Sequence, residues 1–192
     1  MLYVWIILIG NIAIITGNLA FSRISPLPEG ILGAILLPIL NTVAVIAFDG
    51  IAAFFIRRLP EKWFSSESKL SIVSRRECKF YTILGVRKWR SKVPELGMFT
   101  NFRKNKVYEP SSNDYLKRYI LEANYGVIIH FACVIVGFAI LFICHSACAL
   151  RIGLPVAIVN AILNLMPTFV LRYNLPKLQS LIRMNERRAR KT

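Results

Sequence analysis

The sequence predicts an all-α integral membrane protein with about four transmembrane helices. Three observations predict this fold class: hydrophobic residues make up 55 % of the 192 residues, mean hydropathy is +0.51, and four long stretches carry almost no formal charge. A helix needs roughly 20 apolar residues to cross the hydrocarbon core of a bilayer. We expect a single membrane domain over residues 1–192, with spans at residues 2–22, 30–56, 123–149 and 152–171.

The first apolar stretch differs from a cleavable signal peptide. It has no basic n-region, its apolar run is longer than usual, and no small-x-small cleavage site follows it. We therefore interpret it as a retained span. The sequence SRISPLPEG, rich in Ser, Pro and Gly, joins it to the second span and is typical of a tight turn.

The second span carries a carboxylate, Asp49, about three-quarters of the way along it. A carboxylate inside a membrane is energetically costly, and so it is a functional candidate by default. The structural alternative is an ion pair between Asp49 and Arg57 or another basic residue at the interface.

A basic segment at residues 57–119 separates the second and third spans. Residues 57–118 hold 16 Lys or Arg and six Asp or Glu, a net charge of +10, and aromatic residues are interleaved among them. This pattern is typical of a surface at the level of the lipid headgroups. Within the segment we expect a helix that ends near Gly85, mostly loop at residues 98–113, and a helix that begins at Asn113 or Asp114 and continues into the third span.

The tail at residues 172–192 is the second basic segment, with seven Lys or Arg against Glu186, a net charge of +6. Leu175, Leu178 and Ile182 recur at helical spacing, which predicts an amphipathic helix at the membrane interface. Basic segments are retained on the cytosolic side, so we expect a multi-pass cell-membrane protein with both termini in the cytosol. No nucleic-acid motif accompanies the charge, and anionic headgroups account for it.

Cysteine and histidine offer only a weak metal signal. Cys144, His145 and Cys148 have spacings compatible with one helix face, but no second ligand cluster exists in the sequence. We expect buried cysteines and no metal or cofactor.

Polar residues in the third and fourth spans are the remaining candidates. Glu122, Asn124 and His130 lie where a basic helix enters the third span. Asn160 and Asn164 lie four residues apart on one face of the fourth span, where they are expected to bridge helices.

Three blocks of sequence resemble the glycosyl-4,4′-diaponeurosporenoate acyltransferase family, over about residues 77–190. The first, ECKFYTILGVRKWRSKVPELG (77–97), is similar to an aromatic and VRKWK-containing region of that family. The second, YILEANYGVIIHF (119–131), stands where the family has approximately E-T-x-R-A-E-x-x-H-W. The third, NLMPTFVLRYNLPKL (164–178), is close to N-x-P-x-x-x-x-Q-R-Y-N-R-P-R-L.

The resemblance implies transfer of a fatty acyl group to a hydroxyl of a membrane glycolipid, a glycosyl carotenoid or a similar molecule. The expected donor is acyl-CoA, used as a substrate, and the expected partners are the bilayer and a lipid-linked acceptor. The basic cytosolic face suits a phosphate-bearing donor, and the apolar bundle suits a long lipid acceptor.

Acyl transfer to an alcohol needs a general base and donors for the developing oxyanion. His130 is the expected base, with Glu122 and Asp49 as candidate catalytic carboxylates. Glu122 precedes His130 by eight residues, about 12 Å along an ideal helix, which is too far for a direct hydrogen bond. The expected substrate-binding residues match or adjoin the motifs: Asn124, Lys88, Trp89, Arg90, Arg172, Tyr173 and Asn174.

The chain departs from the family motif beside His130. Val127 replaces the second motif Glu, Tyr125 and Gly126 replace an Arg–Ala pair, and Leu175 replaces a later Arg. Either Asp49 or Glu122 supplies the carboxylate from another direction, or the activity has changed or been lost.

Two hypotheses of different classes follow. The first is a membrane O-acyltransferase, and the second is a non-catalytic subunit or adaptor that binds lipid or a partner membrane protein. A metal or transport function that uses Asp49, His130 and His145 is a third and weaker alternative.

Overall fold

A computed structural model describes residues 2–27, 29–93, 107–143 and 148–191. Within these ranges the structure is all-helical, with no β-strand. Its long helices are α1 (Leu2–Phe21), α2 (Gly30–Ile56), α5 (Asn113–Gly137) and α8 (Leu154–Ala189), and its short α-helices are α3 (Arg75–Ile83), α4 (Val86–Trp89) and α6 (Ile140–Ile143). One π-helical turn, Ala149–Gly153, leads directly into α8.

In the part of the chain that the structure describes, four helices are long and apolar enough to cross a membrane: Leu2–Phe21, Gly30–Ile56, Asn113–Ile143 and Ala149–Ala189. Many of their large apolar side chains are exposed, among them Trp5 and Ile9 on α1, which are each about 60 % exposed. Such exposure is expected when lipid, and not water, surrounds the helices. The chain is a multi-pass membrane protein.

The chain forms two compact units. The first unit contains Met1–Phe55 and Ile129–Leu165, and the second contains Ile56–Ile128 and Met166–Thr192. Helices α5 and α8 each contribute residues to both units. Each unit has its own core and its own polar network.

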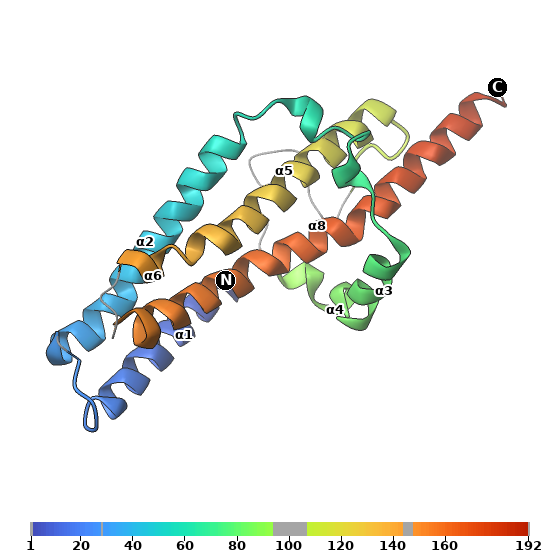
Figure 1. The fold of residues 1–192 in the computed structure, drawn as a ribbon. Coiled ribbons are helices and arrows are strands. Elements are labelled where there is room, and N and C mark those ends of the chain that lie inside the picture. The colour runs from blue at the N-terminus through green and yellow to red at the C-terminus, as the bar shows by residue number, and fades with distance from the viewer. Residues whose placement is uncertain (1, 28, 94–106, 144–147, 192) are drawn as a thin grey trace. The chain divides into compact units, whose positions relative to one another are not determined.

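The first unit is built from α1, α2, α6 and parts of α5 and α8. A short connection at residues 22–29 joins α1 to α2, and Gly30 at its end has a φ of +66°, a conformation that glycine adopts without strain (Figure 1). Its core consists of apolar side chains, including Ala34, Val45, Ile140, Ile152 and Ala157. These side chains are small or branched, so the helices pack closely against one another.

The second unit contains the short helices of the basic segment. Ser74 caps α3, since its Oγ accepts a hydrogen bond from the backbone N–H of Glu77 at 3.1 Å. Gly85, with a φ of +63°, separates α3 from α4, so the expected helix end near this glycine is confirmed. A core of Leu116, Ile120 and Leu175 joins α5 to α8 in this unit.

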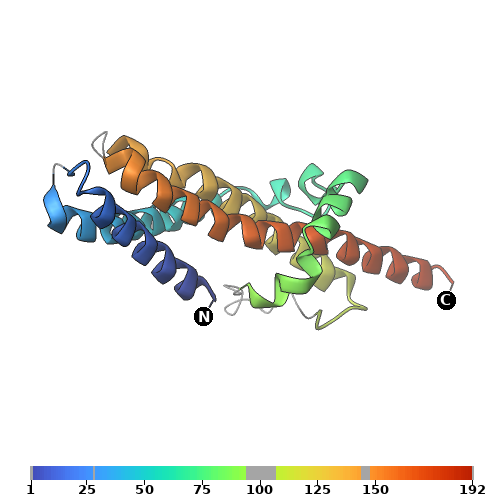
Figure 2. The ribbon, with the colours of Figure 1, turned by 90° about the horizontal axis from the view of Figure 1, so that it is seen from below.

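The expected helix start at residue 113 is confirmed, and the helix does continue into the third span. The loop expectation for residues 98–113 is met at residues 107–112, whereas residues 98–106 lie outside the described residues. The third span is interrupted: α5 ends at Gly137 and α6 begins at Ile140. The fourth span and the expected tail helix form one continuous helix, α8, that includes Pro167 and Pro176 (Figure 2).

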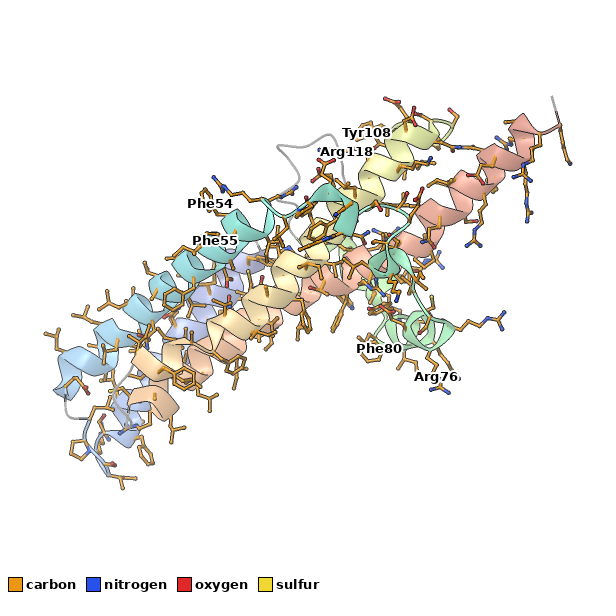
Figure 3. All side chains as sticks on the ribbon, turned by 45° about the horizontal axis from the view of Figure 1, so that its top comes forward. Phe54, Phe55, Arg76, Phe80, Tyr108 and Arg118 are labelled. Carbon is orange, nitrogen blue, oxygen red and sulfur yellow. The ribbon has the colours of Figure 1, made fainter. Side chains whose placement is uncertain are left out.

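Exposed side chains mark the outer surfaces of both units. Phe54 and Phe55 project from the end of α2, and Phe80 and Arg76 project from α3 (Figure 3). Helix α3 thus exposes both an aromatic and a basic group, and a position of the basic segment at the lipid headgroups stays a prediction.

Candidate functional site

Three polar side chains from α2 and α8 form a hydrogen-bonded cluster in the first unit. The Nδ2 of Asn164 donates to Oδ2 of Asp49 at 2.9 Å and to Oδ1 of Asn160 at 3.0 Å. The Nδ2 of Asn160 lies 3.4 Å from Oδ1 of Asp49. Asn160 and Asn164 are buried and Asp49 is half-buried. Amide donors thus solvate both oxygens of a carboxylate that lies in an apolar helix bundle.

His130 joins this cluster from α5. Its Nδ1 lies 2.9 Å from Oδ1 of Asn164. The orientation of the Asn164 amide is determined by its other neighbours, because exchanging oxygen and nitrogen would place the oxygen against three acceptors: Asp49 Oδ2, Asn160 Oδ1 and the Asn160 carbonyl. Asn164 therefore accepts and His130 Nδ1 donates. In the neutral ring the basic lone pair is then on Nε2.

A close approach between α5 and α8 positions the second asparagine. The Nδ2 of Asn160 donates to the carbonyl of Cys133 at 3.2 Å, and a Cβ at Gly137 would lie only 2.4 Å from that Nδ2. Only a glycine at this position leaves room for the Asn160 amide. The Cys133 thiol in turn lies 3.7 Å from the backbone carbonyl of Asp49, which ties α5 to α2.

The contacts of Asp49 and Asn164 can orient the His130 imidazole as a proton acceptor and stabilise its protonated form. Asp49, Asn164 and His130 form a continuous hydrogen-bonded chain in which the carboxylate polarises the amide and the amide orients the imidazole. Positive charge that forms on the ring when Nε2 takes a proton is stabilised through Nδ1–H. The same order of roles, with an orienting group behind a histidine base, is found in unrelated hydrolases.

Sequence reasoning had identified His130 and Asp49, but it did not identify Asn164 as the link between them. The available signal was the Asn160–Asn164 spacing on one face of the fourth span, and it was interpreted only as a bridge between helices. That bridge is confirmed, since the two amides contact groups on both α2 and α5.

Glu122 has different partners in the second unit. Its Oε2 accepts from Arg57 at 2.6 Å and its Oε1 lies 3.2 Å from Arg118, while its side chain is only 10 % exposed. Arg118 also reaches Glu61 at 3.1 Å. The alternative of an ion pair between Asp49 and Arg57 is therefore wrong, because Arg57 pairs with Glu122. A catalytic role for Glu122 stays a prediction.

Asn124, which lies between the motif positions of Glu122 and Tyr125, is fully buried. Its Nδ2 donates to the Phe64 carbonyl at 2.8 Å and to Ser71 Oγ at 2.7 Å. Tyr125, which replaces a motif Arg, stacks on Phe64 with ring centroids 3.9 Å apart. Val127, which stands at the second motif Glu, is also buried. These contacts connect α5 to the segment that follows α2, and a substrate-binding role for Asn124 stays a prediction.

Arg172 is the centre of a third cluster. Its Nε and an Nη bind the two carboxylate oxygens of Glu77 at 2.7 and 2.8 Å, and its guanidinium also donates to the backbone carbonyls of Leu70 and Ile72. Tyr81 donates to Glu77 at 2.6 Å. Burial alone would raise the pKa of Glu77, but the hydrogen bonds from Arg172 and Tyr81 outweigh burial and lower it. Burial, together with the Glu77 carboxylate, raises the pKa of Tyr81.

The other expected substrate-binding residues lie near Arg172 in the second unit. Arg90 donates to Asn174 Oδ1 at 3.1 Å, and the Tyr173 ring lies 5.9 Å from the Arg90 guanidinium and 4.1 Å from the Lys177 ammonium. Trp89 Nε1 donates to the Leu84 carbonyl at 3.0 Å, and Lys88 is exposed. Substrate binding by these residues stays a prediction.

Metal binding finds no support in the part of the chain that the structure describes, where no three His, Cys, Asp or Glu residues gather closely enough to hold an ion. Cys144 and His145, which carried the weak metal signal, lie outside the described residues. Cys148 is buried, and its thiol donates to Glu29 at 2.9 Å.

Comparison with known proteins gives one match. The sequence model of a family described as glycosyl-4,4′-diaponeurosporenoate acyltransferase matches residues 60–184. This range covers more than half of the chain and contains all three sequence blocks that carry the resemblance, which is thereby confirmed. No curated protein and no solved structure matches the chain.

Proposed function

The chain belongs to the glycosyl-4,4′-diaponeurosporenoate acyltransferase family, and on this premise we propose that it moves a fatty acyl group from acyl-CoA to a hydroxyl of a membrane glycolipid, such as a glycosyl carotenoid. The observation that carries the proposal is the hydrogen-bonded chain from Asp49 through Asn164 to His130. It supplies an oriented base within a bundle suited to a lipid acceptor.

In the proposed reaction His130 is the general base. Its Nε2 takes the proton of the sugar hydroxyl as the hydroxyl oxygen attacks the thioester carbonyl. The carbon–sulfur bond then breaks, and the thiolate of CoA leaves and takes the proton from the imidazolium. Asn164 is a positioning residue that keeps the proton on Nδ1, and Asp49 stabilises the transient charge on the ring through Asn164.

We also propose that the basic segments and both termini face the cytosol. The net charges of +10 over residues 57–118 and +6 over residues 172–192 favour this orientation. In this orientation the Lys and Arg side chains of the second unit meet the phosphates of a cytosolic acyl donor.

The direct test is an acyl-transfer assay in membranes that contain the full chain, labelled acyl-CoA and a glycosylated polyene lipid. We expect His130→Ala to lower the rate by about 10²- to 10⁴-fold, the range of general-base catalysis. The matched control is Phe131→Ala, since Phe131 is adjacent on α5 and 52 % exposed. An unchanged rate in His130→Ala would remove His130 from catalysis.

Asn164 is tested separately through the pH profile. Asn164→Leu removes the acceptor for Nδ1–H, and we expect a lower kcat together with a displaced acidic limb of the rate profile, where the imidazole base becomes protonated. A purely structural role would lower the amount of folded protein and leave the shape of the profile unchanged.

A non-catalytic membrane subunit or adaptor is the second candidate function. The observation that favours it is Val127, an apolar and buried residue where the family motif has its second Glu. A stoichiometric partner that copurifies with an inactive wild-type chain would favour the adaptor. Acyl transfer that appears only in Val127→Glu would indicate an enzyme that has lost its activity.

A further inference from the structure

A second candidate site lies in the first unit, at the start of the fourth span and away from Asn164, the residue that His130 contacts. It is an open groove of about 460 Å³ where α1 meets the π-helical turn and the start of α8. Arg151 at the groove precedes Asn164 by 13 residues, roughly 20 Å along a helix. The groove is therefore separate from the Asp49–Asn164–His130 chain.

The lining of the groove is almost entirely apolar. Ile14, Gly17 and Phe21 line it from α1, and Pro155 lines it from α8. Its volume lies within the range of about 300 to 1,000 Å³ that is typical of sites for small organic ligands. In a membrane-spanning bundle the available apolar ligand is a lipid chain.

Arg151 adds a cation at the end of the groove. Its Nη1 donates to the Ser25 carbonyl at 2.7 Å, and its guanidinium carbon lies 4.7 Å from the centroid of the Phe21 ring. A second nitrogen lies 3.4 Å from the carbonyl of Asn18, and Asn18 donates in return to the Arg151 carbonyl at 3.1 Å. The guanidinium is thus held in place from α1 and its following turn.

The described partners of the Arg151 guanidinium are neutral. Among the residues that the structure describes, its hydrogen bonds go to backbone carbonyls and no ion pair with a carboxylate is present. Glu29, in the same α1–α2 connection, accepts from Cys148. A guanidinium has five N–H donors in a planar fork, which matches the geometry of a phosphate. The positive charge of Arg151 is accordingly available to an anionic ligand.

We propose that this groove binds an anionic phospholipid of the bilayer. One acyl chain lies along Ile14, Gly17 and Phe21, and the phosphodiester accepts hydrogen bonds from Arg151. The apolar lining selects a lipid over a free inorganic anion, and the guanidinium selects an anionic headgroup over a zwitterionic one. In the orientation proposed above the bound lipid belongs to the outer leaflet. The inference does not depend on the acyltransferase proposal, since lipid binding is measured without an acyl donor.

Two glycines allow the groove to be filled with a matched control. A Cβ at Gly17 would meet nothing within 4 Å, so the side chain of Gly17→Leu starts in open space at the lining of the groove. A Cβ at Gly50 on α2 likewise meets nothing within 4 Å, and Gly50→Leu is the control. Both substitutions favour the helix, because Leu is a better helix former than Gly.

The experiment is native mass spectrometry of the full chain in a non-ionic detergent, titrated with phosphatidylglycerol and with phosphatidylcholine of the same chain lengths. We expect the wild type to show one phosphatidylglycerol site about tenfold tighter than the corresponding phosphatidylcholine site. Gly17→Leu loses this site and Gly50→Leu keeps it. Because other Lys and Arg side chains also bind anionic lipids, the difference between these two variants is the decisive quantity.

Arg151→Gln tests the headgroup contact, with Arg23→Gln as its control, since Arg23 is an exposed arginine in the α1–α2 connection. We expect Arg151→Gln to abolish the preference for phosphatidylglycerol, and Arg23→Gln to retain it. If Arg151→Gln fails to fold, the pair of glycine variants still decides the question. Equal lipid binding in Gly17→Leu and Gly50→Leu, or displacement of the lipid by inorganic phosphate alone, overturns the proposal.

Discussion

A carboxylate in the first unit is bound by asparagine amides, whereas two carboxylates in the second unit are bound by arginine side chains. Asp49 receives two amides and no guanidinium among its described contacts, while Glu77 and Glu122 each bind arginine. Amides solvate a carboxylate without adding a second charge to an apolar environment, where each charge is costly. The comparison shows amide hydrogen bonds around a carboxylate of the first unit and charge pairing around two carboxylates of the second. We predict that the first arrangement serves function and that the second serves stability.

The largest expected effect lies in the second unit, at Arg172. Arg172→Met leaves Glu77 without its cation and two backbone carbonyls without their donor, and we expect a loss of about 3 kcal/mol in the free energy of unfolding. Denaturant or thermal unfolding in detergent measures it. Arg187→Met, which removes an exposed arginine of the same helix, is the control, and equal losses in both variants would contradict the assignment of Arg172 to the fold.

In the first unit we expect a small change in stability and a larger change in activity. Asp49→Asn keeps an acceptor oxygen for Asn164 and removes the charge, so stability should change by less than about 1 kcal/mol. Acyl transfer should fall about tenfold, since the imidazolium loses its remote countercharge. A large loss of stability without a loss of activity would reverse the comparison between the two units.

Acid should reveal the pairing of Glu77. The pKa of this carboxyl is lowered in the folded state from its ordinary value of 4.5. As pH falls below that value, the unfolded state therefore binds more protons than the folded state. The contribution of Glu77 to stability is therefore complete above that value and is lost as pH falls through the lowered pKa. Between neutral pH and pH 3 the free energy of unfolding should decrease more steeply in the wild type than in Glu77→Gln. The same decrease in both proteins would contradict the pairing.

The smallest effect is expected at Arg118. This side chain is 50 % exposed and its partner Glu61 is 64 % exposed, so solvent screens the pair. Arg118→Ala should cost less than about 1 kcal/mol, and Glu122 should keep its pair with Arg57. A loss as large as that in Arg172→Met would show that the Glu122 network is as important to the fold as the Glu77 network.

The sequence was most informative where a local rule decides the structure. Apolar runs predicted the first two spans to within a residue, and Gly85 and Asn113 predicted one helix end and one helix start. The break after Gly137 was missed, because no Pro or charge marks it and the glycine serves a contact with α8. The continuous α8 was missed because the fourth span was ended where its uncharged run meets the basic tail, whereas the helix continues through Arg172.

The candidate site was predictable only in part, because its members meet across three helices. The helical spacing correctly separated Glu122 from His130, and the high cost of a membrane carboxylate identified Asp49. Nothing local in the sequence indicates that Asn164 lies between Asp49 and His130, since this depends on the packing of α2, α5 and α8 within the first unit. Hydrophobic periodicity determines which residues are buried, and it leaves the polar contacts between helices undetermined.

The contact between Gly137 and Asn160 has a consequence for comparing relatives of this chain. With only 2.4 Å between the Asn160 amide and a Cβ at position 137, any larger residue there requires a smaller side chain at position 160. The two positions should therefore covary among family members. Relatives that exchange both residues together would mark a branch in which the donor to the second-span carboxylate has been replaced.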